Sequence, residues 1–125
     1  MWVKANPNPL NQEVPDCVIR AISIALNQPW LQTFDELCSV ARSDFNMPSS
    51  DSVWGHYLYL KGFEPFLIPS SCPRCITVER FTKEFPYGVY IIGTGSHAIA
   101  VIHGNYFDSW DSGSEVPTFF WRISN

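Results

Sequence analysis

Residues 17–26 are apolar on almost every side, and this run limits the possible folds more than any other part of the chain. A helix with so little polar surface is buried on most sides, because a helix on a protein surface carries one polar face. Asp16 stands directly before the run and is predicted to be the helix N-cap. We therefore expect a helix in the middle of the domain, with Cys17 in its first turn.

The rest of the chain divides into helices followed by strands. Residues 1–15 are expected to form an ordered arm, since the prolines and asparagines of this stretch exclude regular helix. Further helices are predicted over residues 30–42, 50–60 and 77–85, and strands over 89–92, 97–102, 105–110 and 118–123. Helices first and antiparallel strands second indicate an α+β fold with a sheet of about four strands.

The size and charge of the chain exclude several classes of protein. A chain of 125 residues fills one hydrophobic core, so residues 1–125 are predicted to form a single domain. A net charge of −4 provides no basic stripe for a phosphate backbone. The apolar runs are too short to span a membrane, and residues 1–7 lack the layout of a signal peptide. We therefore expect a cytoplasmic protein with no nucleic-acid or membrane partner; the oligomeric state stays open.

Cys17 is the first candidate for chemistry. A thiol in the first turn of a buried helix meets unpaired N–H groups and the positive end of the helix dipole, which stabilise a thiolate and can stabilise an oxyanion. The alternative is that Cys17 is a small buried apolar residue. A thiolate nucleophile needs a base, and His97 is the best placed histidine, since it opens a strand after small residues. His56 and His103 are expected to be structural or surface residues.

The alternation of side chains along a strand selects a third residue. If residues 103–104 form a two-residue type I′ turn, Asp108 lies opposite Ile99 on the neighbouring strand. Ile99 shares a face with His97, because strand side chains alternate. Asp108 is then a diagonal neighbour of His97 and can accept its second ring N–H. Asp111 has the opposite parity and is the alternative if the turn holds three residues.

The order of a helix-borne Cys, a strand-borne His and an Asp on the next strand resembles the papain-like cysteine peptidases, in their compact C39-like group. Shorter motifs resemble a small family of proteins from Gram-positive gut bacteria and their phages. These motifs are Asn6-Pro7-Asn8-Pro9, Asp16-Cys17-Val18-Ile19-Arg20-Ala21-Ile22, Met47-Pro48-Ser49-Ser50, Ser52-Val53-Trp54-Gly55, Cys72-Pro73-x-Cys75, Gly93-Thr94-Gly95-x-His97 and Tyr106-x-Asp108-Ser109-Trp110-Asp111-Ser112-Gly113.

The resemblance implies a papain-like fold and a cysteine peptidase or related thiol amidohydrolase of a bacterial or prophage cytoplasm. By the same resemblance, Cys17 is the nucleophile, His97 the general base and acid, and Asp108 the residue that orients His97. The implied substrate is a protein or peptide, and no cofactor is implied. An acyltransferase that uses the same Cys–His pair stays possible, since only the acceptor differs.

The papain-like pattern also places an oxyanion-hole Gln shortly before the Cys, and this chain departs from it. The matching position is Asn11, and Gln12 is one residue off. Asn8 belongs to the Asn-Pro motif of the smaller family and is the candidate oxyanion donor. The departure favours an alternative function, a non-catalytic papain-like binding protein, for example a phage inhibitor of a host defence protein.

Two further features concern metal binding and solvent access. Cys72 and Cys75 have the spacing of half a zinc site, but only Cys38 and His56 remain to complete four ligands. We therefore expect two loop thiols and no metal. Trp110 lies two positions after Asp108, and we expect its ring either in the core or over His97, where it would exclude water.

Overall fold

The computed structural model describes residues 1–69 and 75–123, and its fold is α+β, as predicted. The helices are α1 (Cys17–Leu26), α2 (Trp30–Asp44), α3 (Asp51–Leu60) and α4 (Val78–Glu84). The strands are β1 (Trp2–Lys4), β2 (Phe63–Leu67), β3 (Val89–Gly93), β4 (Ala98–Ile102), β5 (Asn105–Asp108) and β6 (Phe119–Ile123). In this part of the chain, no helix is both long and apolar enough to cross a membrane.

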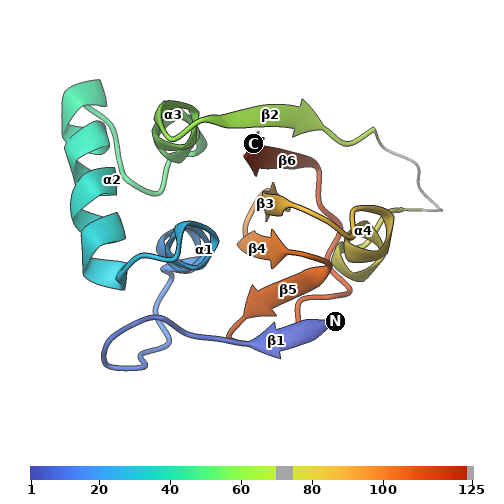
Figure 1. The fold of residues 1–125 in the computed structure, drawn as a ribbon. Helices are drawn as coiled ribbons and strands as arrows, with labels where there is room; N and C mark the ends of the chain where they lie inside the picture. Colours follow the sequence, from blue (N-terminus) through green and yellow to red (C-terminus); the bar gives the residue numbers. More distant parts are fainter. Residues whose placement is uncertain (70–74, 124–125) are drawn as a thin grey trace.

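The strands form one mixed sheet in the order β1-β5-β4-β3-β6-β2 (Figure 1). The prediction of about four antiparallel strands is wrong in number, because β1 and β2 add an edge strand on each side. β1 pairs with β5 in parallel, whereas the other neighbours are antiparallel. β1 is only three residues long and β2 contains Pro65, so neither has a clear strand pattern in the sequence.

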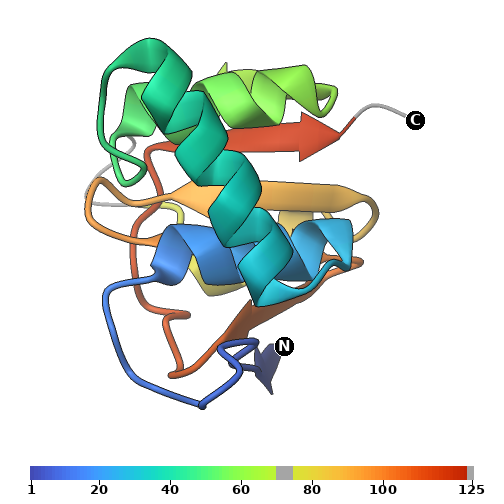
Figure 2. The same ribbon diagram turned by 90° about the vertical axis from the view of Figure 1, so that its left-hand side faces the viewer.

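Helices cover both faces of this sheet. Figure 1 shows α1, α2 and α3 on one side and α4 on the other, and Figure 2 shows α2 outermost over α1. Ile22 of α1 and Ile91 and Ala100 of the sheet belong to the core on the first side. Phe81 of α4 packs with Ile99 and other residues on the second side. The long apolar helix α1 therefore lies between the sheet and α2, and none of its residues is exposed, as predicted.

Two tight turns set the positions of the strand ends. His103 (φ 47°) and Gly104 (φ 80°) are both left-handed, which a two-residue type I′ turn requires. Ile102 consequently pairs with Asn105, so the register predicted for β4 and β5 is confirmed. At the other end of β4, the Thr94 N–H donates to the His97 carbonyl at 2.9 Å. His97 therefore lies between a closed turn and the first residue of β4.

Candidate active site

His97 and Asp108 lie side by side at one end of the sheet. His97 Nε2 is 2.5 Å from Asp108 Oδ2, and both side chains are almost completely buried. The sequence left Asp108 and Asp111 as alternatives, and the structure places only Asp108 against the imidazole. The Asp111 carboxylate instead accepts a hydrogen bond from the Tyr106 hydroxyl at 2.5 Å. The two-residue turn at 103–104 is the reason, because it puts Asp108 on the same face of the sheet as His97.

Further donors fix the Asp108 carboxylate in place. The Ser112 hydroxyl donates to Asp108 Oδ2 and the Ser109 N–H donates to Oδ1, each at 2.8 Å. The carbonyl of Asp108 accepts from the Ala5 N–H at 2.9 Å and from the Trp2 indole at 3.2 Å. The loop after β5 therefore holds the carboxylate, whereas Trp2 and Ala5 hold the main chain of the same residue.

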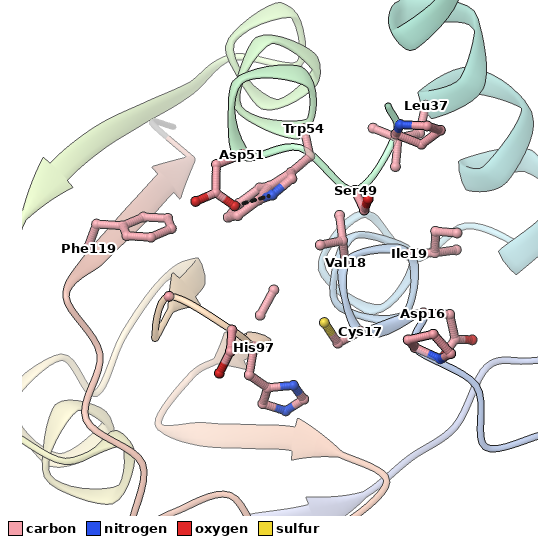
Figure 3. A pocket seen from close by; sticks show the side chains of 15 residues that line it. Asp16, Cys17, Val18, Ile19, Leu37, Ser49, Asp51, Trp54, His97 and Phe119 are labelled. Atoms are coloured by element: carbon pink, nitrogen blue, oxygen red, sulfur yellow. Dashed lines mark hydrogen bonds between the residues drawn. The ribbon is translucent and has the colours of Figure 1, made fainter. Parts of the chain in front are cut away.

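Cys17 is the first residue of α1. Cys17 and His97 line one cavity, and the thiol of Cys17 is on the side of that cavity where His97 lies (Figure 3). Burial raises the pKa of the Cys17 thiol. Hydrogen bonds with the His97 side chain and the Ala98 N–H, together with the charges of His97 and Arg20, have the opposite effect and prevail. The net result is a pKa below the ordinary value of 9.0, which favours the thiolate.

The pKa of His97 moves in the complementary direction. Burial lowers it, but hydrogen bonds and charge interactions with Asp108 and Cys17 outweigh burial and raise the pKa to about 9. The pKa of Asp108 is affected first by burial, which raises it, and then by His97 and Ser112, which bring it below 3.8 overall. Near neutral pH these shifts favour a thiolate at Cys17, an imidazolium at His97 and a carboxylate at Asp108.

Arg20 is a buried cation that the sequence analysis did not select. Its guanidinium pairs with the carboxylate of Asp16 and lies 3.6 Å from Asp108 Oδ1. It also donates to the Val14 carbonyl at 3.3 Å. Arg20 thus joins the start of α1, which carries Cys17, to the residue that contacts His97. In the sequence, the spacing of Asp16 and Arg20 by one helical turn was the only available signal.

Asp16 stands at the N-cap position, but the prediction that it caps α1 is wrong in one respect. Its side chain makes no hydrogen bond to the first turn of the helix. It accepts instead from Arg20 and from the Trp30 indole at 2.9 Å. The buried guanidinium competes successfully for this carboxylate, because a charge-assisted hydrogen bond is stronger than one to a neutral N–H.

Asn8, the candidate oxyanion donor, does not reach the cavity. Its Nδ2 is directed at Asp16 Oδ2 at 3.4 Å, and its Oδ1 accepts from the Leu10 N–H at 3.0 Å. Asn11 and Gln12 also lie outside the residues that line the cavity. The amide side chains before Cys17 therefore organise the arm, and Asn8 acts on the site only through Asp16.

Trp110 lies against His97, with ring centroids 5.2 Å apart and an angle of 34° between the rings. The indole is half-exposed, so it forms part of the outer wall of the site and is not in the core. His103 occupies the turn described above. His56 is exposed and contacts Asp44 at 2.9 Å, far along the chain from the other candidates. Both histidines thus have the structural or surface positions predicted for them.

The thiol and the imidazole open into a cavity of about 310 Å³. Its lining comes from the start of α1 and the two residues before it, the α2–α3 region, the β3–β4 turn with the first residue of β4, and β6: Pro15, Asp16, Cys17, Val18, Ile19, Leu37, Pro48, Ser49, Asp51, Trp54, Gly95, Ser96, His97, Ala98 and Phe119. Most of these side chains are apolar. Gly95 has a φ of 96° and no side chain to narrow the entrance beside His97.

Of the possible metal ligands, Cys38 lies on α2 and His56 on α3. Cys72 lies outside the described residues, and Cys75 is disulfide-bonded, so the expectation of a free thiol at Cys75 is wrong. Among residues 1–69 and 75–123, no group of three His, Cys, Asp or Glu side chains is arranged to hold a metal ion. Cys38 lies on α2, and burial first and Asp35 second raise its pKa above 9.0. Cys17 and Cys38 therefore have opposite tendencies to ionise.

No protein-family model matches the chain, and neither a curated protein nor a solved structure matches it. The chemistry of the site must therefore be inferred from its side chains. The structure brings together the three residues selected from the sequence as nucleophile, base and orienting acid, and it leaves Asn8 and Asp111 outside this group.

Proposed function

We propose that the protein hydrolyses a peptide or related amide bond through the thiolate of Cys17. The observation that carries the proposal is geometric: Cys17 and His97 line one cavity, and His97 Nε2 lies 2.5 Å from Asp108 Oδ2. The pKa shifts, downward for the Cys17 thiol and upward for the His97 imidazole, agree with this arrangement. A Cys buried only as a small apolar residue has a raised pKa, as Cys38 does. The shift at Cys17 therefore favours a nucleophile over a packing residue.

The chemistry follows from the geometry. The Cys17 thiolate attacks the amide carbon, a C–S bond forms, and the carbonyl electrons move to oxygen. His97 donates its proton to the amide nitrogen as the C–N bond breaks, which leaves a thioester and a free amine. Water then attacks the thioester while His97 accepts its proton, and the thiolate leaves. Asp108 stabilises the imidazolium and holds the ring in place throughout, with a 2.5 Å contact to Nε2.

The oxyanion formed in each step needs hydrogen-bond donors. The first N–H groups of α1 are suited to this role, because Asp16 does not cap them with its side chain. This part of the proposal replaces Asn8, whose amide is engaged with Asp16. Main-chain donors at the helix start stay in position whichever side chains surround them, so catalysis does not require the missing Gln.

A papain-like scaffold is part of the same proposal. A nucleophile at the start of a buried helix and a base on the adjacent antiparallel sheet are features of that scaffold. We further propose a cytoplasmic location in a bacterial host cell and a protein or peptide substrate. The second candidate, a non-catalytic binding protein on the same scaffold, is favoured by one observation: no side-chain amide among Asn8, Asn11 and Gln12 lines the cavity.

The decisive experiment compares thiols within one molecule. Wild type and His97→Ala are treated with iodoacetamide across a pH series, and the alkylated cysteines are assigned by mass spectrometry. We expect Cys17 to react faster than Cys38 near neutral pH, with an apparent pKa that rises when His97 is removed. Cys38 has no histidine partner in the described residues and serves as the internal control.

The opposite result rejects the catalytic proposal. If Cys17 reacts no faster than Cys38, or if its rate ignores the loss of His97, then the thiolate–imidazolium pair does not exist. The protein is then a binding module. A reactive Cys17 justifies a screen of peptide and isopeptide substrates, in which Cys17→Ser and His97→Ala should each abolish turnover.

A further inference from the structure

One carboxylate on the cavity wall has no role in the chemistry above. Asp51 is the first residue of α3, and Figure 3 shows it across the cavity from Cys17 and His97. Its Oδ1 accepts a hydrogen bond from the Trp54 indole at 3.0 Å. Among the described residues, no ion pair involves Asp51, whereas the other acid of the cavity, Asp16, is paired with Arg20.

The surroundings of Asp51 are aromatic. The rings of Trp54 and Phe119 lie 5.6 Å apart and form the adjacent wall of the cavity. A second hollow begins on the other side of Phe119, and it is lined by Asp51, Phe119, Trp121 and three residues of β2. Asp51 therefore stands where two apolar hollows meet, with aromatic side chains in both.

The apolar wall, the aromatic rings and the Asp51 carboxylate together favour one class of ligand. An apolar wall binds an aliphatic stem, aromatic faces attract a cation, and an unpaired carboxylate pairs with one. An acidic ligand would meet repulsion from Asp51. A purely aliphatic ligand would remove water from the carboxylate without replacing its hydrogen bonds. A cation on an aliphatic stem satisfies all three elements at once.

The size of the cavity limits how much of the substrate it holds. About 310 Å³ is at the lower end of the range for ligand cavities, roughly 300–1,000 Å³. Such a volume accepts one large side chain and not a folded protein surface. The selective contact is therefore expected from a single residue of the substrate next to the bond that is cut.

We propose that Asp51 selects substrates with a lysine or arginine side chain, whose stem lies on Trp54 and Phe119 and whose cation pairs with the carboxylate. The inference rests on the proposed hydrolase function, since it describes the substrate of the same site. It makes Asp51 a specificity-determining residue that takes no part in bond breaking.

The test uses two electrophiles that differ only in the cation. The chloromethyl ketones of Nα-acetyl-lysine and Nα-acetyl-norleucine share the same four-carbon stem, and both alkylate Cys17. Rates are measured by mass spectrometry and divided by the iodoacetamide rate of the same variant, so that a general change in thiol reactivity cancels. For wild type we expect a lysine-to-norleucine ratio of about fivefold, the value for a partly exposed ion pair with an aromatic neighbour.

Two variants with the same net charge test whether the lysine-to-norleucine ratio depends on Asp51. Asp51→Asn retains an oxygen for the Trp54 indole and should reduce the ratio to about one. Asp35→Asn removes one exposed acid of α2 that does not line the cavity, and should keep the wild-type ratio. High salt should lower the ratio in wild type, because the pair is reached by solvent.

The outcomes separate the two proposals. If Cys17 is alkylated selectively in a His97-dependent manner but the ratio is close to one, or is unchanged in Asp51→Asn, the specificity inference is rejected and the hydrolase proposal stands. If Cys17 shows no selective alkylation by iodoacetamide, the hydrolase proposal itself fails. A ratio that Asp35→Asn lowers as much as Asp51→Asn would point to net charge and also reject the assignment to Asp51.

Discussion

At the scale of single residues, the site depends on a cation that never touches the reacting atoms. Arg20 is 7% exposed and lies between Asp16 and Asp108. Burial of two carboxylates in this region would be costly without a positive charge between them. Arg20 also contributes to the lowered pKa of the Cys17 thiol. It is therefore a positioning residue that links the helix that carries Cys17 to the carboxylate beside His97.

Replacement of Arg20 tests this link. Arg20→Gln should lower the free energy of unfolding by about 3 kcal/mol, because it leaves the buried Asp16 carboxylate without a cation and Asp108 with His97 alone. It should also raise the apparent pKa of the Cys17 thiol. Arg20→Lys retains the charge and should restore most of the thiol pKa, though less of the stability, since an ammonium cannot reproduce the guanidinium hydrogen bonds. Urea denaturation and the pH dependence of alkylation measure the two effects; equal thiol pKa values in all three proteins would contradict the link.

Asp108 has a different role, because it acts on His97 directly. Asp108→Asn should lower the pKa of His97 from about 9 toward 6.5. The imidazolium is then lost at a lower pH, and turnover near neutral pH should fall about 10- to 100-fold. The pH profile of Cys17 alkylation reports the change.

Asp111→Asn is the matched control for Asp108→Asn. Asp111 accepts from Tyr106 and not from His97, so the pH profile of this variant should match that of wild type. A larger shift in Asp111→Asn than in Asp108→Asn would show that the orienting acid has been assigned to the wrong residue.

At the scale of helices and strands, the conformation of one turn made the position of Asp108 predictable from the sequence. The left-handed pair His103 and Gly104 fixed the register of β4 and β5, and the register placed Asp108 beside His97. The strand β2 escaped prediction because Pro65 and a largely exposed surface conceal its pattern. The ion pair of Arg20 with Asp108 was equally unpredictable, since an arginine on an apolar helix gives no sign of a partner 88 residues away (108 − 20).

The contact between Gly93 of β3 and Phe119 of β6 shapes the cavity, and a methyl group at position 93 would disturb it. Gly93 of β3 pairs with Phe119 of β6, and a Cβ atom at position 93 would lie 2.2 Å from Phe119 Cζ. Gly93→Ala should displace this ring from the cavity wall and cost roughly 1–3 kcal/mol of stability. It should also lower the lysine-to-norleucine ratio.

Gly62→Ala is the control that distinguishes backbone strain from displacement of the Phe119 ring. Gly62 has a φ of 89° and open space around its Cα, so an alanine there adds strain of about 1 kcal/mol without touching Phe119. Urea denaturation of both variants and their alkylation ratios provide the comparison. If Gly62→Ala changes the ratio as much as Gly93→Ala does, the ratio reports stability and not the shape of the cavity.

At the scale of the whole molecule, the site leaves a signature in the pH dependence of folding. Above about pH 6.5 and above the lowered pKa of the folded Cys17 thiol, but below about pH 8.5, an unfolded chain has a protonated thiol and a neutral imidazole, which together hold one proton. The folded pair of thiolate and imidazolium also holds one. Because stability changes with pH only when folding changes the number of bound protons, this pair contributes no slope in that range.

In Cys17→Ala, ionisation of the thiol no longer cancels the effect of His97 protonation on the pH dependence of the free energy of unfolding. His97 retains Asp108 as its partner, so its folded pKa stays above 6.5. Its stabilisation is then complete below pH 6.5 and is lost as the pH rises through the folded pKa, with a slope of at most about 1.4 kcal/mol per pH unit. Urea denaturation from pH 6 to 9 should give a steeper decline for Cys17→Ala than for wild type. Parallel curves would show that wild type has no thiolate–imidazolium pair.

The distribution of the site along the chain has a consequence during synthesis. His97, directly before β4, and Asp108, the last residue of β5, are 11 residues apart, whereas Cys17 precedes His97 by 80 residues (97 − 17). A nascent chain therefore contains Cys17 before His97 and Asp108 are synthesised, so we expect its thiol to have an ordinary pKa until β4 and β5 assemble. On this expectation, the Cys17 thiol is weakly reactive while the chain is being synthesised. The rate of Cys17 alkylation can therefore be used to follow the completion of folding.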